Sequence, residues 1–287
     1  GWKDLPCDSM SSIYSIETAQ RLFVYASETG YEGRDVKVEI SREVSVSGCD
    51  AEGRESKCVI RQDEGELFVI GKSVVSGEIE VSYMRIMVES GEGKVIVNEG
   101  SGNVRLKEMS IFVGGSEDIG DSLIRSRNGC LIVEKVEVGV ICGDEGLHVW
   151  NGNEFAIVRA PVIDVKAESS LVISSCLMKH IGLSTCRTTP ARLLSGCVPS
   201  EISGVIYVEK AKELSILNTS FEECSIGDQP VIRVCIDEES SVVIGEGSRD
   251  VVFEDTSPTI DTVYLNYVSE MCASSSSSFD MSFNTHR

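Results

Sequence analysis

The sequence predicts an all-β solenoid, namely a right-handed parallel β-helix with three short strands in each coil and a short N-terminal capping helix. Three observations predict this fold. A two-strand apolar motif recurs along the chain, a third apolar strand precedes most copies, and turn-forming residues separate the strands. The chain of 287 residues is 41% hydrophobic, so it can bury a continuous core.

The recurring motif reads apolar-x-apolar-x-x-apolar-x-apolar. Each half alternates, so each half is a short strand with one buried face, and the residues between the halves form a sharp bend. Such short strands find partners only if successive copies stack in register, about 4.8 Å apart. The five copies lie at 79–86, 104–111, 131–138, 171–178 and 214–221.

A third strand lies upstream of most copies, at 67–69, 95–97, 163–165, 206–208 and 231–234. Successive motifs are 25, 27, 40 and 43 residues apart, counted between residues 84, 109, 136, 176 and 219. A coil of about 25 residues accounts for the short steps. The long steps predict inserted loops at 143–154 and 182–203, both rich in small or polar turn residues. Insertions in a solenoid usually cluster on its binding face.

The two ends differ from this repeat. Apolar residues at helical spacing predict an amphipathic helix over 12–29, which would cover the open first coil. The first strand follows at 35–40. The β-helix domain is expected to span 1–270, and the Ser-rich segment 271–287 is expected to be a linker or tail.

Two other β architectures fit less well. An immunoglobulin-like array predicts hairpin turns such as Asn-Gly between successive strands, and Asn128-Gly129 and Asn151-Gly152 occur, but most junctions lack them. A leucine-rich repeat predicts a shorter period and a Leu-rich consensus, which the chain does not show.

The net charge of −20 comes from 46 acidic and 26 basic residues. Such a surface repels phosphate backbones, which argues against nucleic acid as a partner. No apolar run approaches the roughly 18 residues of a membrane span, so no transmembrane segment is expected.

The chain contains 11 cysteines but no Cys-x-x-Cys pair and only three histidines. This pattern predicts no structural zinc and no other metal or cofactor. The cysteines are either small buried hydrophobes or members of disulfides in an oxidising compartment. The pairs Cys49–Cys58 and Cys186–Cys197, each bracketing a turn or loop, are the first candidates for disulfides.

The helix, the first strand and the stacked motifs together resemble the pectin-lyase-like superfamily. The copy at 214–221, followed by Cys224, is also similar to the Phe-x-x-Cys repeats of β-helical surface adhesins. This resemblance implies the β-helix fold over most of the chain. It leaves the function open, because the superfamily includes lyases, hydrolases, adhesins and scaffolds.

The resemblance also implies where catalytic residues would lie. Pectate-lyase-like enzymes use an Arg-x-Pro-x-x-Arg motif, but here Arg159-Ala160-Pro161 is followed by Asp164 where the second Arg belongs. The Gly-His-Gly and Arg-Ile-Lys motifs of polygalacturonase-like enzymes are missing. We therefore predict no catalytic residues. The carboxylates that remain as candidates for a hydrolytic pair, or as plain surface acids, are Asp164, Asp228, Asp237 and Glu239.

Several residues are candidates for binding or modification. His148, Trp150 and Tyr207 are candidate glycan contacts, although aromatic residues make up only 6% of the chain. Asn218 begins an N-glycosylation sequon. His180 alternates with Cys176 and Met178 and is expected to be a hydrogen-bonded core or turn histidine rather than a base.

These observations favour a non-catalytic extracellular or cell-surface module, such as a component of a coat, filament or adhesin. Its expected partners are other copies of itself, neighbouring surface proteins and glycans. The alternative is a polysaccharide lyase or glycoside hydrolase with the same fold.

Overall fold

The computed structural model describes the strands and most of the turns between them. The described residues are 21–25, 31–33, 37–50, 53–62, 64–88, 93–114, 118–119, 121–141, 157–158, 160–166, 169–181, 204–209, 212–224, 230–236, 240–245, 251–254, 263–267, 279–281 and 283–286.

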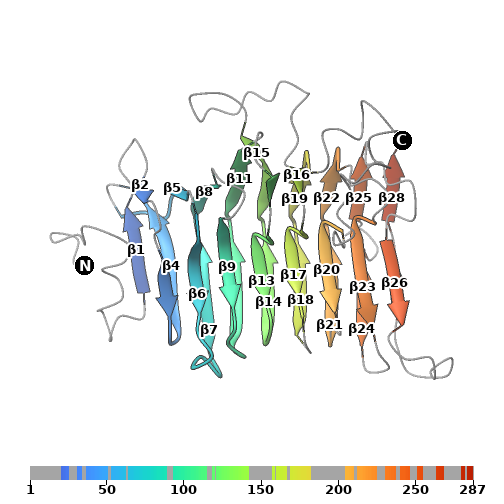
Figure 1. The fold of residues 1–287 in the computed structure, drawn as a ribbon, viewed down its shortest axis with the longest axis horizontal. Coiled ribbons are helices and arrows are strands. Elements are labelled where there is room, and N and C mark those ends of the chain that lie inside the picture. The colour runs from blue at the N-terminus through green and yellow to red at the C-terminus, as the bar shows by residue number, and fades with distance from the viewer. Residues whose placement is uncertain are drawn as a thin grey trace.

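The chain forms a right-handed parallel β-helix built from three long sheets (Figure 1). It passes from sheet I through a sharp bend into sheet II, crosses to sheet III, and returns to sheet I one strand further along. The pairings within the three sheets are parallel, and the coils follow one another along the long axis from the N-terminal to the C-terminal end.

Each sheet contains one strand from every coil. Sheet I comprises β1 (Arg21–Tyr25), β4 (Val44–Cys49), β7 (Glu78–Ser82), β10 (Asn103–Lys107), β14 (Cys130–Glu134), β18 (Ser170–Ser174), β21 (Glu213–Leu217), β24 (Ser241–Ile244) and β27 (Phe279–Met281). Sheet II comprises β2 (Tyr31–Gly33), β5 (Cys58–Gln62), β8 (Met84–Val88), β11 (Ser110–Gly114), β15 (Glu137–Ile141), β19 (Leu177–Lys179), β22 (Ser220–Glu222), β25 (Val251–Glu254) and β28 (Phe283–His286).

Sheet III comprises β3 (Val38–Ile40), β6 (Glu66–Ile70), β9 (Lys94–Asn98), β13 (Ile124–Ser126), β17 (Ile163–Val165), β20 (Ile206–Glu209), β23 (Ile232–Ile236) and β26 (Val263–Tyr267). A separate two-stranded sheet pairs β12 (Asp118–Ile119) with β16 (Ile157–Val158). The five predicted two-strand motifs correspond to β7–β8, β10–β11, β14–β15, β18–β19 and β21–β22, so the predicted fold class is confirmed.

Equivalent inward positions of successive coils stack into continuous apolar rows. In sheet I one such row has no exposed member from β4 to β24, and burying each side chain contributes about 1.5–3 kcal/mol. Its residues are Val46, Val81, Leu106, Val133, Ile173, Ile216 and Ile244. The rows of all three sheets meet in one core along the axis.

Five of the bends between sheets I and II contain one residue in the left-handed region. These residues are Tyr83, Glu108, Lys135, Ser175 and Asn218, with φ between 48° and 56°. The backbone N–H groups of the first four donate to the next coil, as from Lys135 to the Ser174 carbonyl at 2.9 Å. None is Gly, so each bend holds an L-residue in a conformation it rarely adopts.

A polar pair interrupts the apolar core of sheet III. Asn98 and Ser126 occupy inward register positions and are fully buried. The Asn98 amide donates to Ser126 Oγ and to the Asn128 carbonyl, both at 3.0 Å, and its oxygen accepts from the Gly100 N–H at 3.0 Å. These bonds satisfy a buried amide and hold the turn that follows β9.

The expected capping helix over 12–29 is wrong for the part that the structure describes. Residues 21–25 form β1, which pairs in parallel with β4, and 12–20 and 26–29 lie outside the described residues. Leu22 and Val24 are buried while Phe23 between them is half exposed, which is the alternation of a strand. Backbone pairing with β4 outweighs the helical spacing of the apolar residues.

The expected tail also contains strands. β27 and β28 pair in parallel with β24 and β25, so strands of the β-helix extend past the predicted boundary at 270. The Ser-rich run 274–278 lies outside the described residues. The expected loops 143–154 and 182–203 lie outside them as well, and both precede strands of sheet III.

The bend conformation predicts the effect of substitutions at Lys135. Lys135→Val should be about 1–2 kcal/mol less stable than Lys135→Asn, because a β-branched residue resists the left-handed region that Asn tolerates. Both variants lose the Lys135–Glu108 ion pair (2.8 Å), so urea unfolding of the two isolates the backbone effect. The same pair of substitutions at Lys107, within β10, should show no such preference for Asn, and equal stability at 135 would contradict the interpretation.

The buried amide predicts a second effect. Asn98→Ala leaves the Gly100 N–H without its acceptor and removes the bonds to Ser126 Oγ and the Asn128 carbonyl, so it should cost about 1–3 kcal/mol in urea unfolding. Asn103→Ala, at an exposed position in β10, is the matched control and should change stability little. A similar loss in both variants would show that the Asn98 hydrogen bonds contribute nothing.

Candidate functional site

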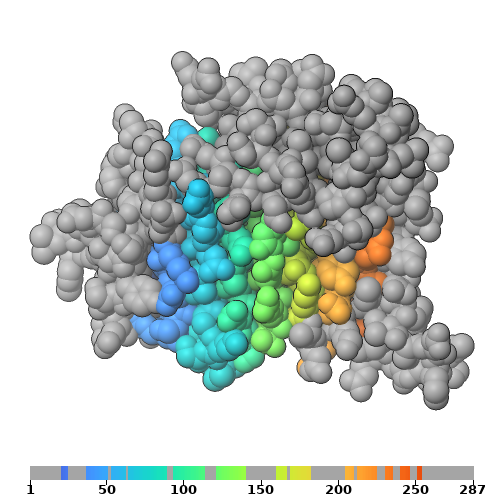
Figure 2. All heavy atoms as spheres, in the orientation of Figure 1, coloured from blue at the N-terminus to red at the C-terminus, as the bar shows by residue number. Residues whose placement is uncertain are grey.

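The outer face of sheet III carries the candidate site. Its central outward row runs through Val69, Val97, Arg125, Asp164 and Tyr207 on successive strands. The row is apolar in β6 and β9 and polar from β13 onward. Asp164 and Tyr207, which the sequence analysis singled out separately, are register partners in this row. The described strands form one continuous surface in chain order (Figure 2).

Asp164 is held between two cations. One of its oxygens, Oδ2, lies 3.7 Å from Arg125 Nε and 3.7 Å from Lys166 Nζ. Arg125 also contacts Asp121, and Lys94 Nζ lies 3.0 Å from the Asp121 carboxylate. The cluster thus contains two carboxylates and three cations from three consecutive coils.

The chain of charges continues toward the N-terminal end of the sheet. Lys94 lies 3.6 Å from Glu66, and Lys37 lies 3.6 Å from Glu66 and 3.3 Å from Glu39. These pairs are partly exposed and contribute at most about 1 kcal/mol each. Their main effect is to alternate positive and negative charge along the face, which leaves no concentrated patch of either sign.

The two carboxylates of the cluster titrate in opposite directions. Burial raises the pKa of Asp164, which is 4% exposed, and the charges of Lys166 and Arg125 only partly offset that rise. Burial also acts to raise the pKa of Asp121. Hydrogen bonds from Lys94 and the Ser122 N–H, together with the charge of Arg125, outweigh it and lower that pKa. One carboxyl is thus easier to protonate than usual and its neighbour is harder.

Two buried polar atoms of the cluster make no hydrogen bond within the described part of the chain. They are Oδ1 of Asp164, an acceptor, and Nε of Arg125, a donor. A single hydroxyl group can donate to the first and accept from the second. The pair is therefore suited to a water molecule or to one hydroxyl of a ligand.

Tyr207 extends the cluster along the sheet. Lys166 Nζ lies 5.8 Å from the centre of its ring, a cation–π contact, and the ring is only partly buried. An aromatic face beside a hydroxyl-accepting carboxylate is the combination that sugar rings contact. His148 and Trp150, the other expected glycan contacts, lie outside the described residues, as do Asp228, Asp237 and Glu239.

The other histidine and the sequon lie on different parts of the coil. His180 follows β19 of sheet II with φ of 55° and is buried, and its Nδ1 lies 3.7 Å from Glu223 Oε2. It is a bend residue, as expected. Asn218 is exposed at the bend between β21 and β22, where its side-chain amide donates to Ser175 Oγ at 3.0 Å.

Five cysteines whose side chains the structure describes are free thiols, namely Cys49, Cys58, Cys130, Cys176 and Cys224. Burial raises the pKa of Cys58 and Cys224 to about 12 and that of Cys176 to about 11, which makes these thiols poor nucleophiles. Cys49 and Cys58 form no disulfide here. Cys58 Sγ lies 3.0 Å from the Cβ that Gly48 lacks, and strand alternation turns Cys49 to the opposite face. Cys186 and Cys197 lie outside the described residues.

Two further features are absent from the part of the chain that the structure describes. No group of three His, Cys, Asp or Glu side chains there is arranged to hold a metal ion. No helix there is long and apolar enough to cross a membrane.

Sequence reasoning identified Asp164 and Tyr207 but missed their cationic neighbours. Strand β13, which carries Arg125, has only one apolar residue, so it lacks the alternating signal of the other third strands. Aligning the third strands by their inward residues places Arg125 beside Asp164, but that alignment requires knowing that a strand exists there.

Comparison of the chain with protein-family models, with curated proteins and with solved structures finds no match. Any inference about the function therefore rests on the geometry of the fold and of its outer faces.

The opposite pKa directions predict opposite pH effects. Because the pKa of Asp164 is raised on folding, the folded state holds more protons than the unfolded state above the ordinary value near 4, and this residue's contribution to stability falls as pH rises to its raised pKa. Asp164→Asn should therefore gain stability relative to the wild type as pH rises through that interval.

Asp121→Asn is the matched control for this effect. The pKa of Asp121 is lowered, so its contribution is full above the ordinary value and is lost as pH falls through the lowered pKa. Relative to this variant, the wild type should lose stability on acidification. Urea unfolding between pH 3 and 7 measures both, and the same pH trend for both variants would rule out the assigned directions.

Proposed function

We propose that this protein is a non-catalytic extracellular β-helix module of the pectin-lyase-like kind with a structural or adhesive role. The observation that supports this most directly is the neutralised outer face of sheet III. Asp121 and Asp164 each contact a cation within 3.0–3.7 Å, whereas a hydrolytic acid and base need carboxyls free to exchange protons with substrate and water. The described thiols with strongly raised pKa values are poor nucleophiles.

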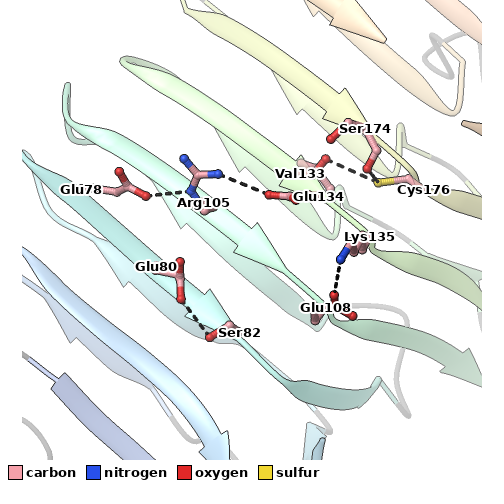
Figure 3. Close-up of polar contacts among 10 residues, drawn as sticks. All are labelled: Glu78, Glu80, Ser82, Arg105, Glu108, Val133, Glu134, Lys135, Ser174 and Cys176. Carbon is pink, nitrogen blue, oxygen red and sulfur yellow. Dashed lines mark hydrogen bonds and ion pairs between the residues drawn. The ribbon is translucent and has the colours of Figure 1, made fainter. Parts of the chain in front are cut away.

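Contacts between coils support a load-bearing role. On sheet I, Arg105 bridges Glu78 (2.7 Å) and Glu134 (3.3 Å) on the two neighbouring strands, and Lys135 pairs with Glu108 at the bend (Figure 3). Hydrogen bonds run from each coil to the next along the whole stack. A rod braced in this way suits a coat, filament or adhesin, with other copies or neighbouring surface proteins as partners.

The Tyr207 cluster gives such a module a ligand surface. Tyr207 supplies an aromatic face, while Asp164 Oδ1 can accept from a hydroxyl group and Arg125 Nε can donate to one. A neutral glycan is the ligand that this chemistry favours, since the net charge of −20 repels polyanions.

One observation favours the alternative, a polysaccharide lyase or glycoside hydrolase. A buried carboxyl with a raised pKa beside an aromatic ring is the environment of a general acid. In this alternative Asp164 would protonate a leaving group, and a second carboxylate outside the described cluster would be required.

A polysaccharide panel separates the two functions. We expect no release of reducing ends and no unsaturated product from acidic or neutral polysaccharides above the level of the heat-denatured protein. A glycan array should instead show binding that Tyr207→Ala weakens by about 3- to 10-fold, since an aromatic stacking contact is worth roughly 0.5–1.5 kcal/mol. Tyr83→Ala, at a bend between sheets I and II, is the control. Cleavage that Asp164→Asn abolishes would contradict the proposal and establish the enzyme.

A further inference from the structure

A second feature lies on the outer face of sheet II, near its N-terminal end. Lys57, Arg85 and Ser110 come from three consecutive coils. Arg85 in β8 is the register partner of Ser110 in β11, so their Cα atoms lie about 4.8 Å apart. Lys57 precedes β5 and reaches past β8, so that its Nζ donates to Ser110 Oγ at 2.7 Å. The Lys57 ammonium therefore contacts this hydroxyl, and Arg85 lies next to Ser110 on the adjacent strand.

Neither cation has a carboxylate partner within the part of the chain that the structure describes. The side chain of Arg85 makes no ion pair or hydrogen bond there, and its Nε is buried without a partner. The side chain of Lys57 makes only the bond to Ser110. Two adjacent like charges without a counter-charge destabilise a surface, and this one belongs to a chain with a net charge of −20.

The nearest carboxylates along the chain and in register are already paired with other cations. Glu55 contacts Arg21, Glu108 lies 2.8 Å from Lys135, and Glu137, the register neighbour of Ser110, lies 2.9 Å from Lys179. Within the part of the chain that the structure describes, these three acids are already engaged, so an external anion is the group that we expect to neutralise the two cations.

The three side chains offer donors. The Lys57 ammonium and the Arg85 guanidinium carry only N–H groups, and the Ser110 hydroxyl, which accepts from Lys57, keeps its own proton to donate. Ser110 is 2% exposed and Arg85 is partly buried, so charge-assisted bonds formed here are stronger than on an open surface. Donors from three strands around one point match the several oxygens of a tetrahedral oxyanion.

We propose that Lys57, Arg85 and Ser110 form a binding site for a tetrahedral oxyanion, that is, a sulfate or phosphate group, free or as a monoester on a ligand. The site lies on sheet II, apart from the Tyr207 cluster on sheet III, and it does not depend on the function proposed above. It adds recognition of an anionic group to the outer face of sheet II.

Two other cations supply matched controls. Lys107 in β10 and Arg127 after β13 also form no ion pair with other described residues, and neither side chain contacts a hydroxyl next to a second cation there. If an unpaired positive charge alone were sufficient to bind an oxyanion, substitutions at all four positions would act alike. The proposed site requires Lys57 and Arg85 together.

The test is a titration of the whole chain with sodium sulfate and with sodium phosphate. Binding is measured by calorimetry and by the shift in Tm, and sodium chloride at equal ionic strength is the control. The wild type should show saturable binding and a Tm that rises with the logarithm of oxyanion concentration. Lys57→Gln and Arg85→Gln should each weaken the apparent Kd at least about 10-fold, the loss expected for one charge-assisted hydrogen bond. Lys107→Gln and Arg127→Gln should match the wild type.

One further variant and one further ligand test the proposal if a substitution impairs folding. Arg85→Lys retains the charge but loses the planar fork, so it should bind with intermediate affinity even if Arg85→Gln folds poorly. A monosaccharide sulfate bound more tightly than inorganic sulfate identifies an ester on a ligand as the group recognised, and equal affinity identifies the free ion. A Tm rise that is unsaturable or identical in all variants reflects general salt exclusion and overturns the proposal.

Discussion

The fold depends on one constraint, the in-register parallel stacking of coils. No strand that the structure describes has more than six residues, so none forms a stable sheet alone, and each gains its backbone partners from neighbouring coils. The same register aligns inward side chains into rows such as the one that contains Leu106 and Ile216. Backbone pairing and core packing are thus satisfied by the same repeat.

Register also arranges the outer faces. A charge at one position of a coil lies about 4.8 Å from the equivalent position of the next, so opposite charges on neighbouring coils pair across strands, as Arg105 does with Glu78 and Glu134. Where the rows break this pairing, single polar atoms make no hydrogen bond within the described part of the chain. Asp164 Oδ1, Arg125 Nε and Arg85 Nε are such atoms, and for that reason the regions around them are the parts of the structure that we propose for ligands.

Strands β1 and β13 show where the local sequence is insufficient to predict the structure. The segment 21–25 has the spacing of a helix, yet it pairs as a strand because an exposed edge of β4 is available to it. Strand β13 has a polar inward residue, Ser126, which is tolerated because Asn98 on the neighbouring coil donates a hydrogen bond to it. In both cases the deciding interaction comes from a different coil.

The sequence by itself determined the fold class, the five two-strand motifs and most third strands, because alternation and repeat length are local properties that stacking requires. It also identified Asp164 and Tyr207 as residues of interest. Only the tertiary structure decided that these two are neighbours, that Arg125 lies beside the carboxylate, and that Lys57 and Arg85 both lie next to Ser110. The physical reason is that these contacts join residues 25 to 53 positions apart, through a register set by the lengths of turns and inserted loops that local patterns do not fix.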